Sequence, residues 1–147
     1  MLAPTVRVGC AHGKLGLAGT ISVDPGTLIE LAVALADSLA AQGFRLIVLL
    51  STHGGNFGPL DVALARFNGR AGPARACAPR GDVGPDPGRH SGKWLTSVML
   101  ALCPEVVELP AAAASLRSEL READPSAGAA NFERYVSSIV AQIRAHL

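Results

Sequence analysis

The stretch Phe44-Arg45-Leu46-Ile47-Val48-Leu49-Leu50-Ser51-Thr52-His53-Gly54-Gly55-Asn56 decides the fold of this chain. It begins as a long apolar run and ends in Thr-His-Gly-Gly-Asn. An apolar run that is closed by a glycine pair predicts a fully buried strand of a parallel sheet. Polar residues gather at its carboxyl end, where open parallel α/β sheets bind their ligands. We therefore expect a ligand site directly after this strand.

The turn after this strand carries side chains that can do chemistry. The imidazole of His53 can bind a metal ion or carry a proton. Gly54 and Gly55 let the backbone approach a ligand closely, and the Asn56 amide can orient a neighbouring group. A strand followed by an ordinary glycine turn explains the same residues equally well, because short motifs often match by chance.

Composition places the chain among globular proteins. Its 147 residues suffice for one domain with a core, and we predict a single domain over residues 1–147. The net charge is +1 and no basic stripe is visible in the sequence, so we do not expect nucleic acid as a partner. No apolar stretch can span a bilayer, no signal-peptide pattern is visible, and the three cysteines lack paired metal-ligand spacing. We expect a cytoplasmic protein that binds neither nucleic acid nor membranes.

The chain around the central strand alternates between extended and helical patterns. Asp24 and Pro25 predict the start of a helix that Gly43 ends. We predict short extended segments at residues 5–9, 20–23, 74–78 and 106–109, an irregular loop at 79–89, and further helices at about 59–67, 95–102, 111–123 and 132–147. Strand, helix and strand with short connections, beginning at residue 5, predict a parallel βαβ unit.

A second motif, His90-Ser91-Gly92-Lys93-Trp94-Leu95-Thr96-Ser97, leads into one of these helices. This motif and the earlier His53-Gly54-Gly55-Asn56 resemble, in their order and context, two motifs of the creatininase family of metal-dependent amidohydrolases. Gly19-Thr20-Ile21-Ser22 is similar to the Pro-Gly-Thr turn of that family, and residues 96–107 are similar to its Thr-Ser-Leu-Met-Leu-Ala-Leu-x-Pro-x-Leu-Val segment. The helix after Asp124-Pro125 resembles its C-terminal helix. The resemblance implies a three-layer α/β fold, with a mostly parallel sheet between helices, and assembly into homo-oligomers.

The resemblance also implies roles for individual residues. His53 aligns with a metal-ligand histidine and His90 with a histidine near the substrate. We predict catalytic roles for His90, Lys93 and Asn56. Lys14 and Lys93 both lie where family members present their site and could replace a lost cation there, but simple exposure is the interpretation that we favour for both lysines. Contacts with a small-molecule substrate are implied for Lys14, Gly54, Gly55, Trp94 and Thr96.

The sequence departs from the family pattern at the metal site. A full-length member carries a Glu-x-His motif and an aspartate in an N-terminal segment, and we expect this chain to lack them. Lys14 stands where the family often has histidine, and Leu95 replaces the glutamate before Thr-Ser. Family precedent is zinc or manganese, but zinc takes three or four protein ligands and manganese prefers carboxylates. We therefore expect an incomplete metal site, and the cofactor is left unknown.

Other residues have structural as well as chemical explanations. Asp82 and Asp86 are expected to be solvated turn residues rather than ligands. His12 is expected to brace its glycine-rich loop. Cys10 can act as a nucleophile only if a nearby base activates it. Trp94 covers the pocket or fills a contact between subunits.

Three functions remain open from the sequence. The first is a pseudo-enzyme, or a subunit of a larger homo- or hetero-oligomer with another chain. The second is an active amidohydrolase or cyclase of a small substrate, acting on C–N bonds other than peptide bonds, with the missing ligands supplied by a partner chain or by rearranged local residues. The third is a metal-free acid/base enzyme using His53 or His90, with Lys14 or Lys93 as a fixed cation. We favour the first and expect association, because a shortened parallel sheet leaves an edge and apolar surface uncovered.

Overall fold

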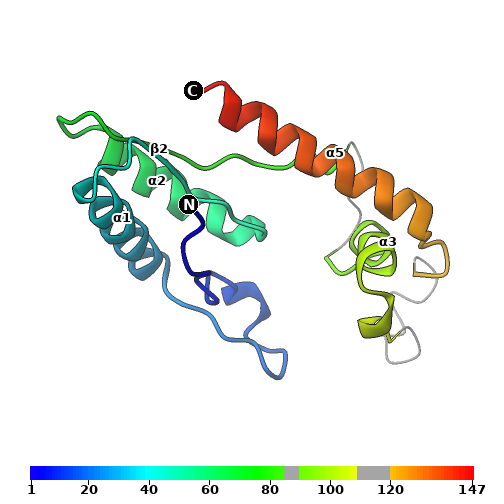
Figure 1. Ribbon diagram of the computed structural model, residues 1–147. Coiled ribbons are helices and arrows are strands. Elements are labelled where there is room, and N and C mark those ends of the chain that lie inside the picture. Colours follow the sequence, from blue (N-terminus) through cyan, green and yellow to red (C-terminus); the bar gives the residue numbers. More distant parts are fainter. Residues whose placement is uncertain (85–89, 109–119) are drawn as a thin grey trace. The chain divides into compact units, whose positions relative to one another are not determined.

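The computed structural model describes residues 1–84, 90–108 and 120–147, which form two compact units (Figure 1). Unit 1 comprises Met1–Arg80 and unit 2 comprises Gly81–Ala145, with the last two residues divided between them. A single domain over the whole chain stays a prediction. Within the described ranges, we find no helix that combines the length and apolar character needed to cross a membrane.

Helix α1 spans Pro25–Ala41 and begins as its sequence predicts. The Asp24 carboxylate accepts a hydrogen bond of 2.7 Å from the Gly26 N–H, and proline at the first position has no N–H to leave unpaired. Gly43 ends the turn after α1 with a φ of 91°, which glycine adopts without strain. The buried face of α1 consists of Leu28, Ala32, Val33 and Ala36.

A parallel βαβ unit follows α1. Strand β1 is Leu46–Val48, helix α2 is Phe57–Asn68 and strand β2 is Arg75–Cys77. The two strands pair in parallel, with Ile47 opposite Ala76. Helix α2 and strand β2 agree with the predictions for residues 59–67 and 74–78.

The core of unit 1 lies between the two helices and one face of the sheet. Helices α1 and α2 lie side by side (Figure 1). Their small side chains allow close packing, and the larger Phe67 fills the space above Ile47 and Ala76. The buried residues of this core are Ala32, Val33, Ala36, Ile47, Leu60, Ala63, Phe67 and Ala76.

The structure corrects the predicted burial of residues 44–50. Regular strand structure is confined to Leu46–Val48, because β2 offers only three residues for pairing. Ile47 points to the helices and is buried. Val48 and Leu50 keep 36% and 53% of their surface exposed. Since alternate side chains of a strand point to opposite faces, the fully buried strand was a wrong prediction for the face away from the helices.

The predicted strands at residues 5–9 and 20–23 do not form. One backbone hydrogen bond, from Val23 N to Gly9 O (3.0 Å), joins the two segments. An extended segment becomes a strand only when a neighbour completes the ladder, and β1 has only β2 as its partner in the described chain. The parallel unit therefore begins at β1 and not at residue 5.

Unit 2 is built from helix α3, Lys93–Leu102, and helix α5, Pro125–Arg144, which pack against each other. A Cβ atom on Gly128 would overlap the carbonyl oxygen of Ser97, so the two backbones touch at this point. Such close approach is possible because glycine has no side chain.

The ends of these helices follow local sequence signals. Helix α3 stops before Cys103-Pro104, as predicted. Asp124 caps α5 by accepting hydrogen bonds from the backbone N–H groups of Ser126 (3.3 Å) and Ala127 (3.0 Å). Helix α5 therefore starts well before the predicted residue 132 and ends before residue 147.

Two predictions between α3 and α5 have different outcomes. Residues 104–106 form a short 3-10 helix, η3, and the described part of the predicted extended segment at 106–109 is not a strand. Leu109 and most of the helix predicted at 111–123 lie outside the described residues. Leu120, the first residue described after that gap, is helical and buried.

Candidate functional site

The loop Ser51–Asn56 follows β1 and carries His53. Its last part, Gly54–Asn56, is a 3-10 helix, η2, that leads directly into α2. The hydroxyl of the buried Ser51 donates to His53 O (3.1 Å) and accepts from His53 N (3.2 Å). The backbone on both sides of the imidazole is therefore fixed.

Asn56 ties this loop to the N-terminal segment. Its Nδ2 donates to Ser51 Oγ (3.1 Å) and its Oδ1 accepts from the Cys10 N–H (2.8 Å). Ser51 Oγ now makes one hydrogen bond as donor and two as acceptor, which uses the full capacity of a hydroxyl. A Cβ on Gly9 would lie 2.6 Å from Asn56 Oδ1, so glycine is needed there for this contact. In this structure Asn56 positions the loop, and its catalytic role stays a prediction.

The two glycines of the motif differ in what surrounds them. A Cβ on Gly55 would overlap the carbonyl oxygen of Cys10 and lie 2.8 Å from His53 Cε1. A Cβ on Gly54 would meet only the Phe57 ring, at 3.9 Å. Gly55 therefore lets the backbone of Cys10 and the His53 ring pack together. Gly54 is not required for close packing.

Cys10 is a packing residue in this arrangement. Its side chain is buried, and that burial, together with the negative charge of Asp24, raises the pKa of the thiol. A raised pKa disfavours the thiolate, which is the nucleophilic form. The environment of Cys10 therefore works against a role as nucleophile.

Lys14 and His12 lie in the short 3-10 helix η1, His12–Lys14, which follows Cys10. His12 Nδ1 lies 3.0 Å from Ser22 Oγ, and Ser22 Oγ accepts a hydrogen bond of 2.8 Å from Ala11 N. This agrees with a bracing role for His12. Lys14 is partly buried. Unit 1 thus holds Lys14 together with the predicted residues of the loop after β1.

The remaining predicted site residues lie in unit 2, at the start of α3. His90 is exposed, and its Nδ1 lies 3.1 Å from Ser91 Oγ. Lys93 Nζ donates to Glu122 Oε2 (3.1 Å) with both side chains exposed, and Thr96 N donates to the Gly92 carbonyl (3.0 Å) in the first helical turn. Leu95 is also exposed.

Trp94 packs with Tyr135 of α5. Their ring centroids are 6.1 Å apart with the planes tilted by 56°, a favourable arrangement for aromatic pairs. Burial of this region raises the pKa of the Tyr135 hydroxyl. The Trp94 indole nitrogen is buried and finds no hydrogen-bond partner among the described residues. Trp94 therefore contributes to packing within unit 2, and its substrate contact stays a prediction.

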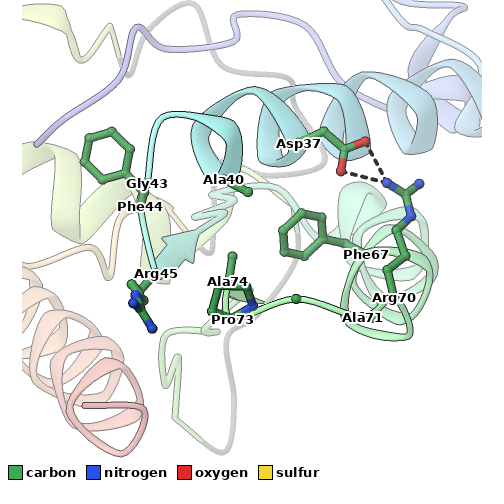
Figure 2. A pocket seen from close by; sticks show the side chains of 11 residues that line it. Asp37, Ala40, Gly43, Phe44, Arg45, Phe67, Arg70, Ala71, Pro73 and Ala74 are labelled. Carbon is green, nitrogen blue, oxygen red and sulfur yellow. Dashed lines mark hydrogen bonds and ion pairs between the residues drawn. The ribbon is translucent and has the colours of Figure 1, made fainter.

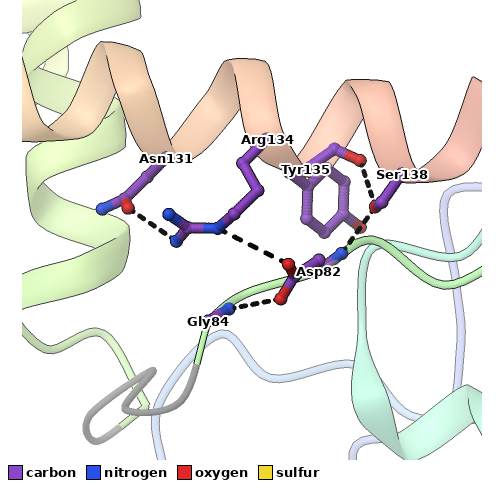
Figure 3. Close-up of polar contacts among 6 residues, drawn as sticks. All are labelled: Asp82, Gly84, Asn131, Arg134, Tyr135 and Ser138. Carbon is purple, nitrogen blue, oxygen red and sulfur yellow. Dashed lines mark hydrogen bonds and ion pairs between the residues drawn. The ribbon is translucent and has the colours of Figure 1, made fainter.

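The segment that precedes the His90 motif is attached to α5 (Figure 3). Asp82 N donates to Ser138 Oγ (2.7 Å), and the Asp82 carboxylate lies 3.7 Å from Arg134 Nε. The same carboxylate accepts from Gly84 N (2.7 Å), as expected of an aspartate in a turn. Asp86 lies outside the described residues.

Unit 1 also contains a cavity of about 370 Å³ at the amino ends of the two strands (Figure 2). Arg70 donates to both carboxylate oxygens of Asp37 there, each at 2.7 Å. Phe44 and Arg45 precede β1, whereas the His53 loop follows it. The cavity therefore lies at the other end of the strands from the candidate site.

Within the described ranges, no three His, Cys, Asp or Glu side chains are grouped closely enough to hold a metal ion. His53 is a suitable single donor, but structural and catalytic zinc sites take three or four. The donors described here do not by themselves fit the divalent metal that the resemblance implies.

Comparison with known proteins settles the family. The sequence model of the creatininase family, described as creatinine amidohydrolase, matches residues 1–143. The chain belongs to the creatininase family. The resemblance inferred from the two histidine motifs is confirmed, and the chain is related to metal-dependent amidohydrolases.

Curated relatives carry the name mycofactocin precursor peptide peptidase. The protein from Mycobacterium ulcerans (strain Agy99) is 35% identical over 128 residues, which cover 86% of this chain and 49% of the relative. That from Mycobacterium tuberculosis (strain CDC 1551 / Oshkosh) is 37% identical over 107 residues, or 71% of this chain and 40% of the relative. The matched part of this chain thus spans less than half the length of either relative.

Solved creatininases share the fold. A mutant creatininase of zinc–zinc type superposes with a TM-score of 0.68 at 25% identity, covering 88% of this chain and 67% of the other. A mutant creatininase complexed with creatine gives 0.67 at 25% identity, with 90% and 69% covered. The α/β creatininase-like fold predicted from sequence is confirmed.

The sequence predictions did not include Ser51 and the backbone N–H of Cys10 among the groups that hold this loop. A serine two residues before His53 is itself a signal, because serine hydroxyls often bond to backbone groups nearby in the chain. The bond from Cys10 to Asn56 joins residues 46 positions apart. No local sequence pattern predicts a contact between residues so far apart in the chain.

Proposed function

We propose that this chain is one subunit of a hydrolytic assembly that cleaves amide C–N bonds, and that it supplies a fixed histidine, His53, to a site completed by another polypeptide. The observation that carries this proposal is the Asn56 amide, which joins Ser51, two residues before His53, to the backbone N–H of Cys10. A loop held so firmly at the carboxyl end of a parallel strand presents its side chain in one place.

The rest of the site has to come from elsewhere if this proposal is correct. His53 offers one donor, and the described acidic residues do not gather around it. The names of the relatives favour an amide of peptide type as the first substrate class to try, whereas the sequence motifs favour C–N bonds other than peptide bonds. Homo- or hetero-oligomeric assembly belongs to the same proposal, and so does a cytoplasmic location.

Titration of the purified chain with Zn²⁺ or Mn²⁺ alone tests the role of His53. We expect at most one weakly bound ion per chain, since a single imidazole holds a divalent cation loosely. His53→Ala should abolish that binding. His146→Ala, which removes an exposed histidine at the far end of the sequence, should leave it intact. Two tightly held ions per chain would refute the proposal. Metal binding by His53→Ala equal to that of the wild type would also refute it.

A pseudo-enzyme is the second candidate, and Leu95 favours it. Leucine stands where the family resemblance implies a glutamate, and it cannot bind a cation or accept a proton. Lys93, two residues before it on α3, forms an ion pair with Glu122. Leu95→Glu separates the two candidates: a gain of metal binding or amide hydrolysis would support a site lost by substitution, and no gain would favour completion by a partner.

A further inference from the structure

The two outer edges of the sheet in unit 1 differ in how their backbone N–H and C=O groups are hydrogen-bonded. On the outer edge of β2, Asn68 Oδ1 accepts a hydrogen bond from Ala76 N (2.8 Å) and Asn68 Nδ2 donates to Ala76 O (2.9 Å). The side-chain amide thus takes the place of a neighbouring strand. It satisfies the N–H and C=O of Ala76, the residue of β2 whose backbone groups point away from β1. The β2 edge is closed.

The outer edge of β1 has no such cover. Arg45 O and Leu49 N bond to Arg75 N and Cys77 O of β2, each at 2.8 Å. Alternate residues of a strand direct their backbone groups to opposite edges, so the N–H and C=O groups of Leu46, Val48 and Leu50 point outward. Within the described chain, these groups have no hydrogen-bond partner.

The side chains along this edge also leave it accessible. Natural proteins protect free edges with lysine, proline, bulges or a covering segment. The residues whose backbone groups point to this edge, Leu46, Val48 and Leu50, are all aliphatic, and the side chains of the last two are exposed. An aliphatic strip beside unpaired backbone groups is suited to receive another strand.

We propose that the outer edge of β1 binds one extended segment of a second polypeptide, which adds to the sheet parallel to β1. The bound segment would have aliphatic side chains at alternate positions, to cover Val48 and Leu50 while its backbone completes the ladder. The inference goes beyond the proposed function and does not depend on whether His53 binds a metal.

The parallel direction follows from the surroundings of β1. The existing pair is parallel, and sheets of one kind are over-represented among proteins. Residues 5–9 also run towards the loop after β1, where Cys10 N is held by Asn56, yet they form no ladder with β1. A parallel segment would end at the same loop and close the gap in hydrogen bonding along β1.

The comparisons point to a source for this segment. The matched residues cover 49% of the M. ulcerans relative and 67% of a solved creatininase. Family members therefore contain chain beyond the part that this protein matches. The unmatched part of the M. ulcerans relative supplies the probe: short overlapping peptides that cover it, each with a fluorescent label.

Binding is measured by fluorescence anisotropy against the whole chain. We expect neighbouring peptides from one region to bind, with a dissociation constant below about 100 μM. Val48→Lys should weaken binding at least about tenfold, because an edge lysine opposes strand addition. Val62→Lys places the same charge on an exposed valine of α2, away from the edge, and should bind as the wild type does. Methylation of alternate backbone nitrogens in the bound peptide should abolish binding, because it removes the ladder donors.

Three results would overturn the inference. One is the absence of binding by every peptide, and another is equal binding by wild type and Val48→Lys. The third is a wild-type dimer that Val48→Lys alone dissociates in sedimentation, because a second copy would then occupy the edge. Leu50→Lys provides the same test if Val48→Lys fails to fold. Loss of metal binding in His53→Ala with peptide binding retained separates this inference from the proposed function.

Discussion

The two histidine motifs are held in place by different kinds of contact. The His53 loop depends on polar bonds, in which Ser51 and Asn56 use their hydrogen-bonding groups to fix a short turn. The His90 motif depends on packing, because it leads into α3, and α3 is fixed where Ser97 touches Gly128 of α5.

This difference predicts which substitutions destabilise each region. A packed helix pair is sensitive to added volume, since close-packed interiors have little free space. A polar loop is sensitive to the loss of single hydrogen bonds, because the partner group is left unsatisfied. Substitutions that add one methyl group test the close backbone contacts, which both regions contain at one glycine, and removal of one amide tests the polar bonds that only the His53 loop depends on.

Gly128→Ala should have the largest effect. The new methyl group would overlap the Ser97 carbonyl, so the helices must move apart, at a cost of about 3 kcal/mol in the free energy of unfolding. Urea titration followed by circular dichroism measures the helices of both units, and the fluorescence of Trp94, the one tryptophan in the chain, reports separately on unit 2. Gly58→Ala is the control, because a Cβ there meets nothing within 4 Å and α2 should be unchanged or slightly more stable. Equal stability of the two variants would contradict the close helix contact.

Gly55→Ala should rank second. Its methyl group would displace the Cys10 backbone and the His53 ring, which we expect to cost about 2 kcal/mol. Gly54→Ala tests the specificity of this effect within the same motif, and it should cost less than about 0.5 kcal/mol. Urea unfolding monitored by circular dichroism measures both. A larger loss in Gly54→Ala would show that the loop is packed differently.

Asn56→Ala should destabilise unit 1 by about 1.5 kcal/mol, because it leaves the Cys10 N–H without its acceptor. Asn56→Asp keeps an acceptor for Cys10 but loses the donor to Ser51, so it should lie between alanine and wild type. Hydrogen exchange at the Cys10 amide gives the direct measurement. Rapid exchange in Asn56→Asp as well as Asn56→Ala would mean that the Ser51 contact, and not the Cys10 contact, holds the loop.

The smallest effect concerns Asp124 and pH. Hydrogen bonds from Ser126 and Ala127 lower the pKa of this N-cap carboxyl in the folded state. The ionised form therefore stabilises α5 above the ordinary aspartate pKa, and this contribution is lost as the pH falls through the lowered value. Thermal melting should show less acid dependence in Asp124→Asn, since asparagine caps helices without titrating. Identical pH profiles would exclude a role for this carboxyl.

Features set by local chemistry were predictable from the sequence. Asp24-Pro25 and Asp124-Pro125 start helices, and Gly43 ends the turn after α1, because caps and positive φ angles depend on a few adjacent residues. The position of His53 after a strand was also predictable from the apolar run before it.

Features set by distant partners were not predictable. Residues 5–9 have the pattern of a strand and remain unpaired, because a ladder needs a neighbour that the pattern cannot name. The exposure of Val48 follows from the absence of helices on its face among the described residues of unit 1. The pairing of Lys93 with Glu122 joins residues 29 positions apart, and nothing around Lys93 indicates it.

The amide that closes the β2 edge also determines how the protein ages. Asn68 precedes Gly69, and an asparagine before glycine is prone to lose its amide nitrogen because the glycine N attacks the side chain with little hindrance. In the folded chain that attacking nitrogen bonds to Ala65 O (3.1 Å), and both amide atoms are held by Ala76. These bonds restrain that attack in the folded chain. Each unfolding event allows it, with loss of ammonia to a cyclic imide that water opens to aspartate or isoaspartate. An aspartate there can still accept from Ala76 N but cannot donate to Ala76 O, so a chain that has been damaged in this way refolds with one unpaired carbonyl on the β2 edge.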